Sequence, residues 1–181
     1  IGDVQGKAST LHQMAGIYAQ QGQVDQAIAL YQQSLEIKES IGNVQGKAAT
    51  LGQMAKIYES QGLVEKAFEQ YQQVLEIARQ INHVQYESTA LHQMAGIYAQ
   101  QGQVDQAIAL YQQSLEITER IGYVQGKAVT LQWLGGLFAT KKGEIAKGLA
   151  YLEESAAILE QIKSPEAETS RWAIEQIQKS Q

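Results

Sequence analysis

The three histidines are the side chains in this sequence best suited to binding a metal. His12 and His92 lie 80 residues apart at the same place in a repeated segment, and His83 has no carboxylate or second histidine at ligand spacing. Packed helices lie about 8–10 Å apart, which puts His12 and His92 about 20 Å from each other. One zinc ion needs nitrogen atoms at about 2.0–2.1 Å. We therefore predict no metal site.

Covalent and acid–base catalysis also lack their usual residues. No Ser or Thr lies in a motif that links it to a histidine and an acid, and the chain has no Cys. Carboxylates such as those of Glu36, Glu39, Glu153 and Glu154 have the spacing of solvated helix faces. We predict that the protein is not an enzyme and that it binds no cofactor.

One glycine-containing segment, Gly2 to Ala8 (GDVQGKA), is similar to a phosphate-binding loop. It has three residues instead of four between its glycines, and Ala8 stands where the loop needs Ser or Thr. No apolar strand precedes it, and it recurs at 42–48 and 122–128. These features favour a turn between repeats over a nucleotide site.

The overall composition excludes other classes of function. A net charge of −5 and a pI near 5.2 argue against nucleic-acid binding, which needs a clustered basic surface. No run approaches the ~18–20 apolar residues that span a bilayer, so we expect no membrane segment. The absence of Cys favours a reducing compartment, and we predict a cytoplasmic protein. Because the chain begins Ile1-Gly2-Asp3, we also expect it to be a segment of something longer.

The elements that position these residues repeat every 40 residues. We assign repeats to 1–40, 41–80, 81–120 and 121–162, with one extra residue near Lys141, and a final helix to 163–181. Residues Leu11 to Ile37 are identical to Leu91 to Ile117, whereas the second and fourth repeats have diverged. This pattern favours late duplication of a two-repeat block over consensus design.

Each repeat has the apolar spacing of two helices. In the first repeat the two helical sets are Leu11, Met14, Ala15 and Tyr18, and Ala27, Leu30, Tyr31, Ser34 and Leu35. Glycines that can end a helix separate the sets: Gly22, Gly62, Gly102 and Gly143 within repeats, and Gly42 and Gly122 between them. We predict helices at about 4–21 and 24–40 of the first repeat and their equivalents. Asp3 and Asn43 are the expected N-caps, and His83 and Tyr123 are weaker ones.

The chain ends in a segment of different composition. Ser164-Pro165-Glu166 is a strong helix start and predicts a capping helix at about 165–179. Its expected apolar side consists of Ala167, Trp172, Ala173, Ile174 and Ile177. No such cap precedes the first helix, and we expect that helix to expose an apolar face suited to end-to-end self-association.

These residues resemble the tetratricopeptide repeat. Its pattern of large apolar, Leu, Gly, aromatic, Ala, aromatic and Ala is met by Leu11, Met14, Ala15, Tyr18, Ala27, Tyr31 and Ser34 and by their counterparts in the other repeats. The chain lacks the proline that ends the usual unit, and its 40-residue period is longer than the common one. In this it is similar to extended repeats in spindle-orientation adaptors and bacterial regulatory proteins. The resemblance implies an all-α, right-handed α-solenoid with a C-terminal capping helix.

The resemblance also implies a concave groove that binds a protein or peptide. The family's ligand-facing positions that we expect to form the binding groove are Ser9, His12, Gly16, Gln20, Lys56, Glu59, Thr89, His92, Gly96, Gln100, Gln132 and Gly136. The remaining ligand-facing positions are Ala19, Ala49, Gly52, Ser60, Ala99, Val129, Ala139 and Thr140. Lys56 is the one clear cation among all these positions, so we expect an extended or helical segment to be recognised by hydrogen bonds and small apolar contacts.

The sequence thus predicts a non-catalytic protein-interaction scaffold. Three alternatives stay open: a regulatory or sensor segment of a larger bacterial signalling or effector enzyme, a module for homo-oligomerisation through the solenoid ends, and a spacer with an unused groove. We expect a protein or peptide partner, and neither nucleic acid nor membrane.

Overall fold

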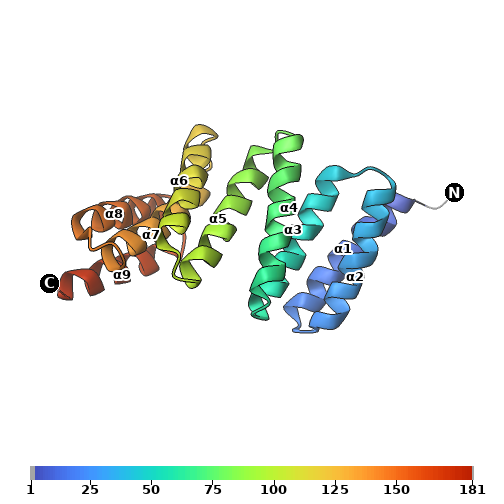
Figure 1. The fold of residues 1–181 in the computed structure, drawn as a ribbon, viewed down its shortest axis with the longest axis horizontal. Helices are drawn as coiled ribbons and strands as arrows, with labels where there is room; N and C mark the ends of the chain where they lie inside the picture. The colour runs from blue at the N-terminus through green and yellow to red at the C-terminus, as the bar shows by residue number, and fades with distance from the viewer. Residues whose placement is uncertain (1–2, 181) are drawn as a thin grey trace. The chain divides into compact units, whose positions relative to one another are not determined.

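The computed structural model describes residues 3–180, which form nine α-helices and no strand (Figure 1). The helices are α1 (Val4–Gln20), α2 (Val24–Ser40), α3 (Val44–Ser60), α4 (Val64–Gln80), α5 (Val84–Gln100), α6 (Val104–Arg120), α7 (Val124–Thr140), α8 (Ile145–Gln161) and α9 (Ala167–Lys179). The predicted all-α fold of paired helices is confirmed. Gly2, the first residue of the loop-like segment, lies outside the described residues.

Glycine ends the helices where the sequence predicts. The six expected glycines have φ between 67° and 75°, a region that costs a residue without Cβ little. At the end of α1, Gln23 N donates to Tyr18 O over 2.9 Å, the bond that closes a helix beyond such a glycine. From α1 to α7, each helix therefore reverses into the next within three residues.

The two predicted N-caps, Asp3 and Asn43, are confirmed, and His83 is a third. The side chains of Asp3 and Asn43 accept from Gly6 N and Gly46 N over 2.7 and 2.8 Å. His83 Nδ1 accepts from Tyr86 N over 3.3 Å, so this histidine caps α5 in the same manner. Tyr123 makes no side-chain cap bond.

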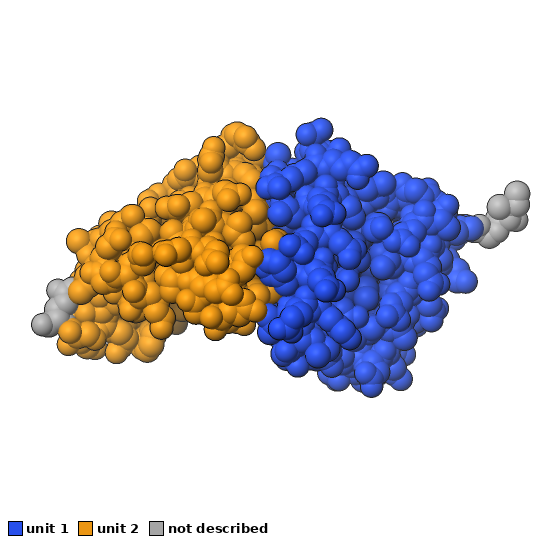
Figure 2. All heavy atoms as spheres, viewed as in Figure 1, with its two compact units in different colours: residues 1–90 blue, residues 91–181 orange. Residues whose placement is uncertain are grey.

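Contacts divide the chain into two compact units, residues 1–90 and residues 91–181 (Figure 2). The first unit holds α1 to α4 and the start of α5, and the second holds the rest of α5 and α6 to α9. Each unit has its own apolar core.

In the first unit the small residues of the repeat bring helices together. Ala15 of α1 and Ala27 of α2 are fully buried and join Tyr31, Met54 and Ile57 in one cluster. Because a methyl side chain permits close helix approach, the larger side chains of the next helix pair pack over this contact. Residues of the repeat's sequence pattern therefore form the apolar core of the first unit.

In the second unit, glycines allow α7 and α8 to approach closely. A Cβ at Gly148 would lie 2.6 Å from Ala139 Cβ and 2.7 Å from Gly135 O, so only glycine fits there. The core around this contact contains Leu134, Phe138 and Tyr111. At the end of the unit, Ala167 of α9 packs on a smaller cluster.

Two predicted core residues are at the surface. Trp172 was expected on the buried side of α9, but it is 63% exposed, and the buried positions there are Ala167 and Ser170. Met14 was expected in the core like the other repeat methionines, but it is 41% exposed, while Met54 is 4% exposed. The described residues place no helix over Met14, whereas Met54 packs in the core cluster of the first unit.

The last helix begins two residues later than expected. The amide groups of Ala167 and Glu168 donate to Ser164 O and Pro165 O over 3.2 and 3.3 Å, a tighter i→i+3 turn. The N-cap is Glu166, and the hydroxyl of Ser164 contacts its carboxylate instead of a helix amide.

Across the described residues, no helix is both long enough and apolar enough to cross a bilayer.

Candidate functional site

Two predicted groove residues, His12 and His92, bind the next repeat. His12 Nδ1 lies 3.1 Å from Thr50 Oγ1, and His92 Nδ1 lies 3.1 Å from Thr130 Oγ1. Each imidazole also meets a buried tyrosine ring edge-on, Tyr31 at 5.1 Å or Tyr111 at 5.0 Å between centroids. These histidines therefore join neighbouring repeats.

Lys38 lies beside the first of these contacts as a buried cation. It is 6% exposed, and its Nζ donates to Thr50 Oγ1 over 2.8 Å. No carboxylate within the described residues forms an ion pair with it. Burial lowers the pKa of Lys38, and burial together with the charge of Lys38 lowers the pKa of His12.

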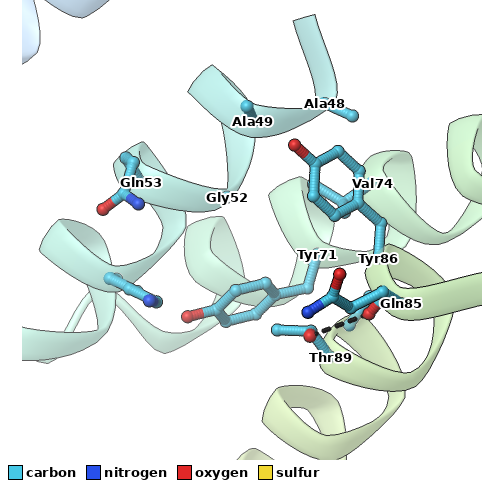
Figure 3. A pocket seen from close by; sticks show the side chains of 11 residues that line it. Ala48, Ala49, Gly52, Gln53, Tyr71, Val74, Gln85, Tyr86 and Thr89 are labelled. Atoms are coloured by element: carbon cyan, nitrogen blue, oxygen red, sulfur yellow. Dashed lines mark hydrogen bonds between the residues drawn. The ribbon is translucent and has the colours of Figure 1, made fainter. Parts of the chain in front are cut away.

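A cavity of about 270 Å³ opens in the first unit between α3, α4 and the start of α5 (Figure 3). Helix α3 lines it with small or polar side chains, α4 contributes an aromatic and an aliphatic residue, and α5 contributes mainly polar ones. The lining residues are Ala48, Ala49, Gly52, Gln53, Lys56, Tyr71, Val74, Gln85, Tyr86, Thr89 and Ala90. The cavity combines an apolar wall with several hydrogen-bonding groups.

The charge in this cavity comes from Lys56, whose ammonium group has no ion-pair partner within residues 3–180. Glu59, one turn further along α3, accepts a hydrogen bond of 3.1 Å from the hydroxyl of Tyr71. Thr89 Oγ1 donates to Gln85 O over 2.9 Å and so is partly occupied by its own helix. The cavity can therefore offer a cation and amide groups to a ligand beside the apolar surface of Val74.

The structure brings only some of the predicted site residues together. Lys56 and Thr89 line the cavity, and Glu59 is held by Tyr71. Ser9, His12, Gly16 and Gln20 belong to α1 of the first unit, while His92, Gly96, Gln100, Gln132 and Gly136 belong to the second unit. Ser9, Gln20 and Gln100 are exposed, and the other members of these two sets are half-buried.

The cavity also includes residues that the sequence analysis missed. Tyr86 stands where the other repeats have Gly6, Gly46 and Gly126, and its ring stacks on His83 with centroids 3.9 Å apart. This substitution of tyrosine for the repeated glycine is the sequence signal that could have identified Tyr86 as a candidate site residue. In the second unit, Trp133 replaces the glutamine of the other repeats, is exposed, and stacks on Tyr111 at 6.4 Å.

No cluster of three or more metal-ligating side chains occurs between residues 3 and 180.

A comparison with curated proteins finds no match. The model of the family described as tetratricopeptide repeat matches residues 6–80 and 86–161.

Solved structures share the fold at low sequence identity. The crystal structure of BtubC (BKLC) from P. vanneervenii has a TM-score of 0.84 and 18% identity, covering 97% of this chain and 73% of that one. Aspartyl phosphate phosphatase F from Bacillus subtilis has a TM-score of 0.84 and 16% identity, covering 92% of this chain and 44% of that one.

A third similar structure is a signal transduction ATPase with numerous domains, with a tetratricopeptide repeat sensor, from Pyrococcus horikoshii. Its TM-score is 0.78 at 20% identity, over 90% of this chain and 25% of that one. These likenesses concern the fold. The family match spans most of the sequence, and the chain therefore belongs to the tetratricopeptide repeat family.

Proposed function

We propose that this chain is a non-catalytic interaction module that binds a segment of a partner protein in the groove of its first unit. The observation that carries the proposal is the cavity between α3, α4 and α5. Its volume of about 270 Å³ lies below the ~300–1,000 Å³ typical of small-molecule sites. It suits one side chain of a bound segment better than a whole cofactor.

The lining residues indicate how such a segment would bind. Gly52 has no side chain to fill the cavity, and a Cβ at this position would meet only Val74 Cγ2 at 4.0 Å. The backbone of α3 is therefore accessible to a bound segment here. An apolar side chain of the segment would pack on Val74 and the ring of Tyr86. The ammonium group of Lys56 and the amide of Gln53 would then reach carbonyl or carboxylate oxygens of the same segment.

Affinity capture from the source organism tests this proposal. The parent is compared with a Gly52→Leu/Lys56→Glu variant, which fills the cavity and reverses its charge. Lys66→Glu is the matched control, since it makes the same charge change on α4 outside the cavity. His12 and His92 are left intact because they join repeats, and circular dichroism verifies the fold of each variant.

A partner that the parent and the Lys66→Glu control retain and the cavity variant loses would support the proposal. Equal capture by all three proteins, or capture by none, would contradict it.

Self-association is a second candidate, favoured by the exposed apolar residues of α1. Val4, Met14 and Ile17 are 45%, 41% and 54% exposed and lie on one helix with little charge. Light scattering that shows a concentration-dependent increase in mass, lost on Ile17→Gln, would favour this reading.

A regulatory role is a third candidate, suggested by the Pyrococcus horikoshii ATPase, in which the similar repeats are described as a sensor. A catalytic domain encoded beside these repeats would favour this role.

A further inference from the structure

Two equivalent tyrosines in the first unit differ in one hydrogen bond. Tyr31 and Tyr71 lie 40 residues apart and are 3% and 2% exposed. The hydroxyl of Tyr71 donates to Glu59 Oε2 over 3.1 Å. The counterpart of Glu59 is Ala19, and within residues 3–180 the hydroxyl of Tyr31 has no hydrogen-bond partner.

Gly16 leaves the hydroxyl of Tyr31 open to the surface. A Cβ at Gly16 would lie 3.4 Å from this oxygen, and Lys56 occupies the equivalent position of the second repeat. A tyrosine hydroxyl that is otherwise buried normally finds a partner. This hydroxyl is therefore available to an acceptor from outside the described chain.

The surroundings of Tyr31 favour a negatively charged acceptor. The ring of Tyr31 meets the edge of His12, and His12 and Lys38 both bind the hydroxyl of Thr50. The ammonium group of Lys38 is buried without a carboxylate partner within the described residues, so its field is poorly screened. A carboxylate near Tyr31 would lower the electrostatic cost of this buried cation.

The third repeat is a natural comparison for this cation. Residues Leu91 to Ile117 repeat Leu11 to Ile37 letter for letter, but the next position changes from Lys38 to Thr118. The histidine–threonine contact is kept between His92 and Thr130 at the same 3.1 Å. The positive charge is thus not required for the contact between repeats.

We propose that Tyr31, Gly16 and Ala19 form a subsite, here called the Tyr31 subsite, that binds a carboxylate of the partner segment at the hydroxyl of Tyr31. The carboxylate takes the place that Glu59 fills beside Tyr71. This inference rests on the proposed function because it assigns one contact of the same bound segment, whose carboxylate is either an acidic side chain or a chain terminus.

The test uses two isosteric probes, N-acetyl-glutamate amide and N-acetyl-glutamine amide, with protein labelled at the tyrosine Cζ carbons. The Tyr31 signal is assigned with Tyr31→Phe, which keeps the ring. The carboxylate probe should shift this signal saturably with a Kd on the order of 1 mM, as expected for a ligand of this size. The glutamine probe should leave the signal unchanged.

Two variants copy residues that the chain itself uses. Ala19→Glu supplies the acceptor found in the second repeat and should abolish the response to the carboxylate probe. Lys38→Thr copies the third repeat and should weaken binding about fivefold by removing the cation. N-acetyl-alanine, whose carboxylate is terminal, distinguishes the two sources: whichever carboxylate probe binds more tightly identifies the one the subsite prefers.

No saturable shift with either carboxylate probe, or an equal shift with the glutamine probe, would overturn the inference. The probes are compared on the parent protein, and Tyr31→Phe serves only to assign the signal, so a folding defect in Ala19→Glu or Lys38→Thr cannot obscure the comparison. A negative result here with a positive capture experiment at the Lys56 cavity would remove the subsite and leave the proposed function standing.

Discussion

His92 Nδ1 lies 3.1 Å from Thr130 Oγ1, and the hydrogen bonds of this threonine show that Nδ1 carries a hydrogen. Thr130 Oγ1 donates its one hydrogen to Gly126 O over 2.8 Å, so it must accept from His92 Nδ1–H. Burial lowers the pKa of His92 to about 4. The imidazole is therefore neutral at physiological pH, with the hydrogen on Nδ1.

This contact predicts that acid weakens the fold. The folded pKa of His92 lies near 4, below its ordinary value of 6.5, so between these values the unfolded chain takes up a proton and the folded chain does not. The free energy of unfolding should fall by about 3 kcal/mol from pH 6.5 to 4 and level off below pH 4 as far as this group is concerned. His12 acts in the same direction, because burial and Lys38 lower its pKa as well.

Urea denaturation of the parent and of His92→Gln at several pH values measures this effect. The glutamine side chain can still reach Thr130 but does not titrate, so the variant should lose less stability between pH 6.5 and 4. Parallel pH profiles for the two proteins would contradict the assignment.

The paired tyrosines predict different costs for removing a hydroxyl group. Tyr71→Phe removes the donor to Glu59 and should lower the free energy of unfolding by about 1 kcal/mol. Tyr31→Phe removes a hydroxyl without a partner within the described residues and should change stability by less than about 0.5 kcal/mol. Denaturation of both variants beside the parent tests the difference, and equal costs would show that Tyr31 has a partner of comparable strength.

The sequence was sufficient for the helices because their ends depend on local residues. Glycine at the left-handed positions and Asp3 or Asn43 at the caps act within a few residues of the chain. The 40-residue period then assigns each apolar position to the same place in every repeat. Such local signals placed α1 and α2 to within one residue at each end.

The site was less predictable because its contacts join different repeats. The position of His12 suggested a groove residue, but Thr50, 38 residues away, holds its Nδ1. Nothing adjacent to Lys38 in the sequence indicates that its ammonium group reaches the same threonine. The predicted burial of Met14 and Trp172 was wrong for a related reason. Whether a side chain at a given repeat position is buried depends on a neighbouring helix that packs over it.

Opposite effects of the same substitution are expected at Gly136 of α7 and Gly148 of α8. Gly148→Ala would press a methyl group against Ala139 and the carbonyl of Gly135, and it should cost about 1–3 kcal/mol. Gly136→Ala meets nothing within 4 Å and should stabilise by about 0.5–1 kcal/mol, because glycine is a poor residue within a helix. Thermal melts of the two variants measure both effects. A stabilising Gly148→Ala would show that α7 and α8 lie further apart than described.

The apolar face of α1 gives the last prediction, which compares two isoleucines at the same repeat position. Ile57 is 8% exposed within the core of the first unit, and Ile57→Ala should cost about 2–5 kcal/mol. Ile17 is 54% exposed, and Ile17→Ala should cost less than about 0.5 kcal/mol in dilute solution. Denaturation at low and high protein concentration separates packing within the chain from packing between chains. A large cost for Ile17→Ala that appears only at high concentration would mean that a second copy covers α1, whereas a large cost at every concentration would contradict the exposure of this face.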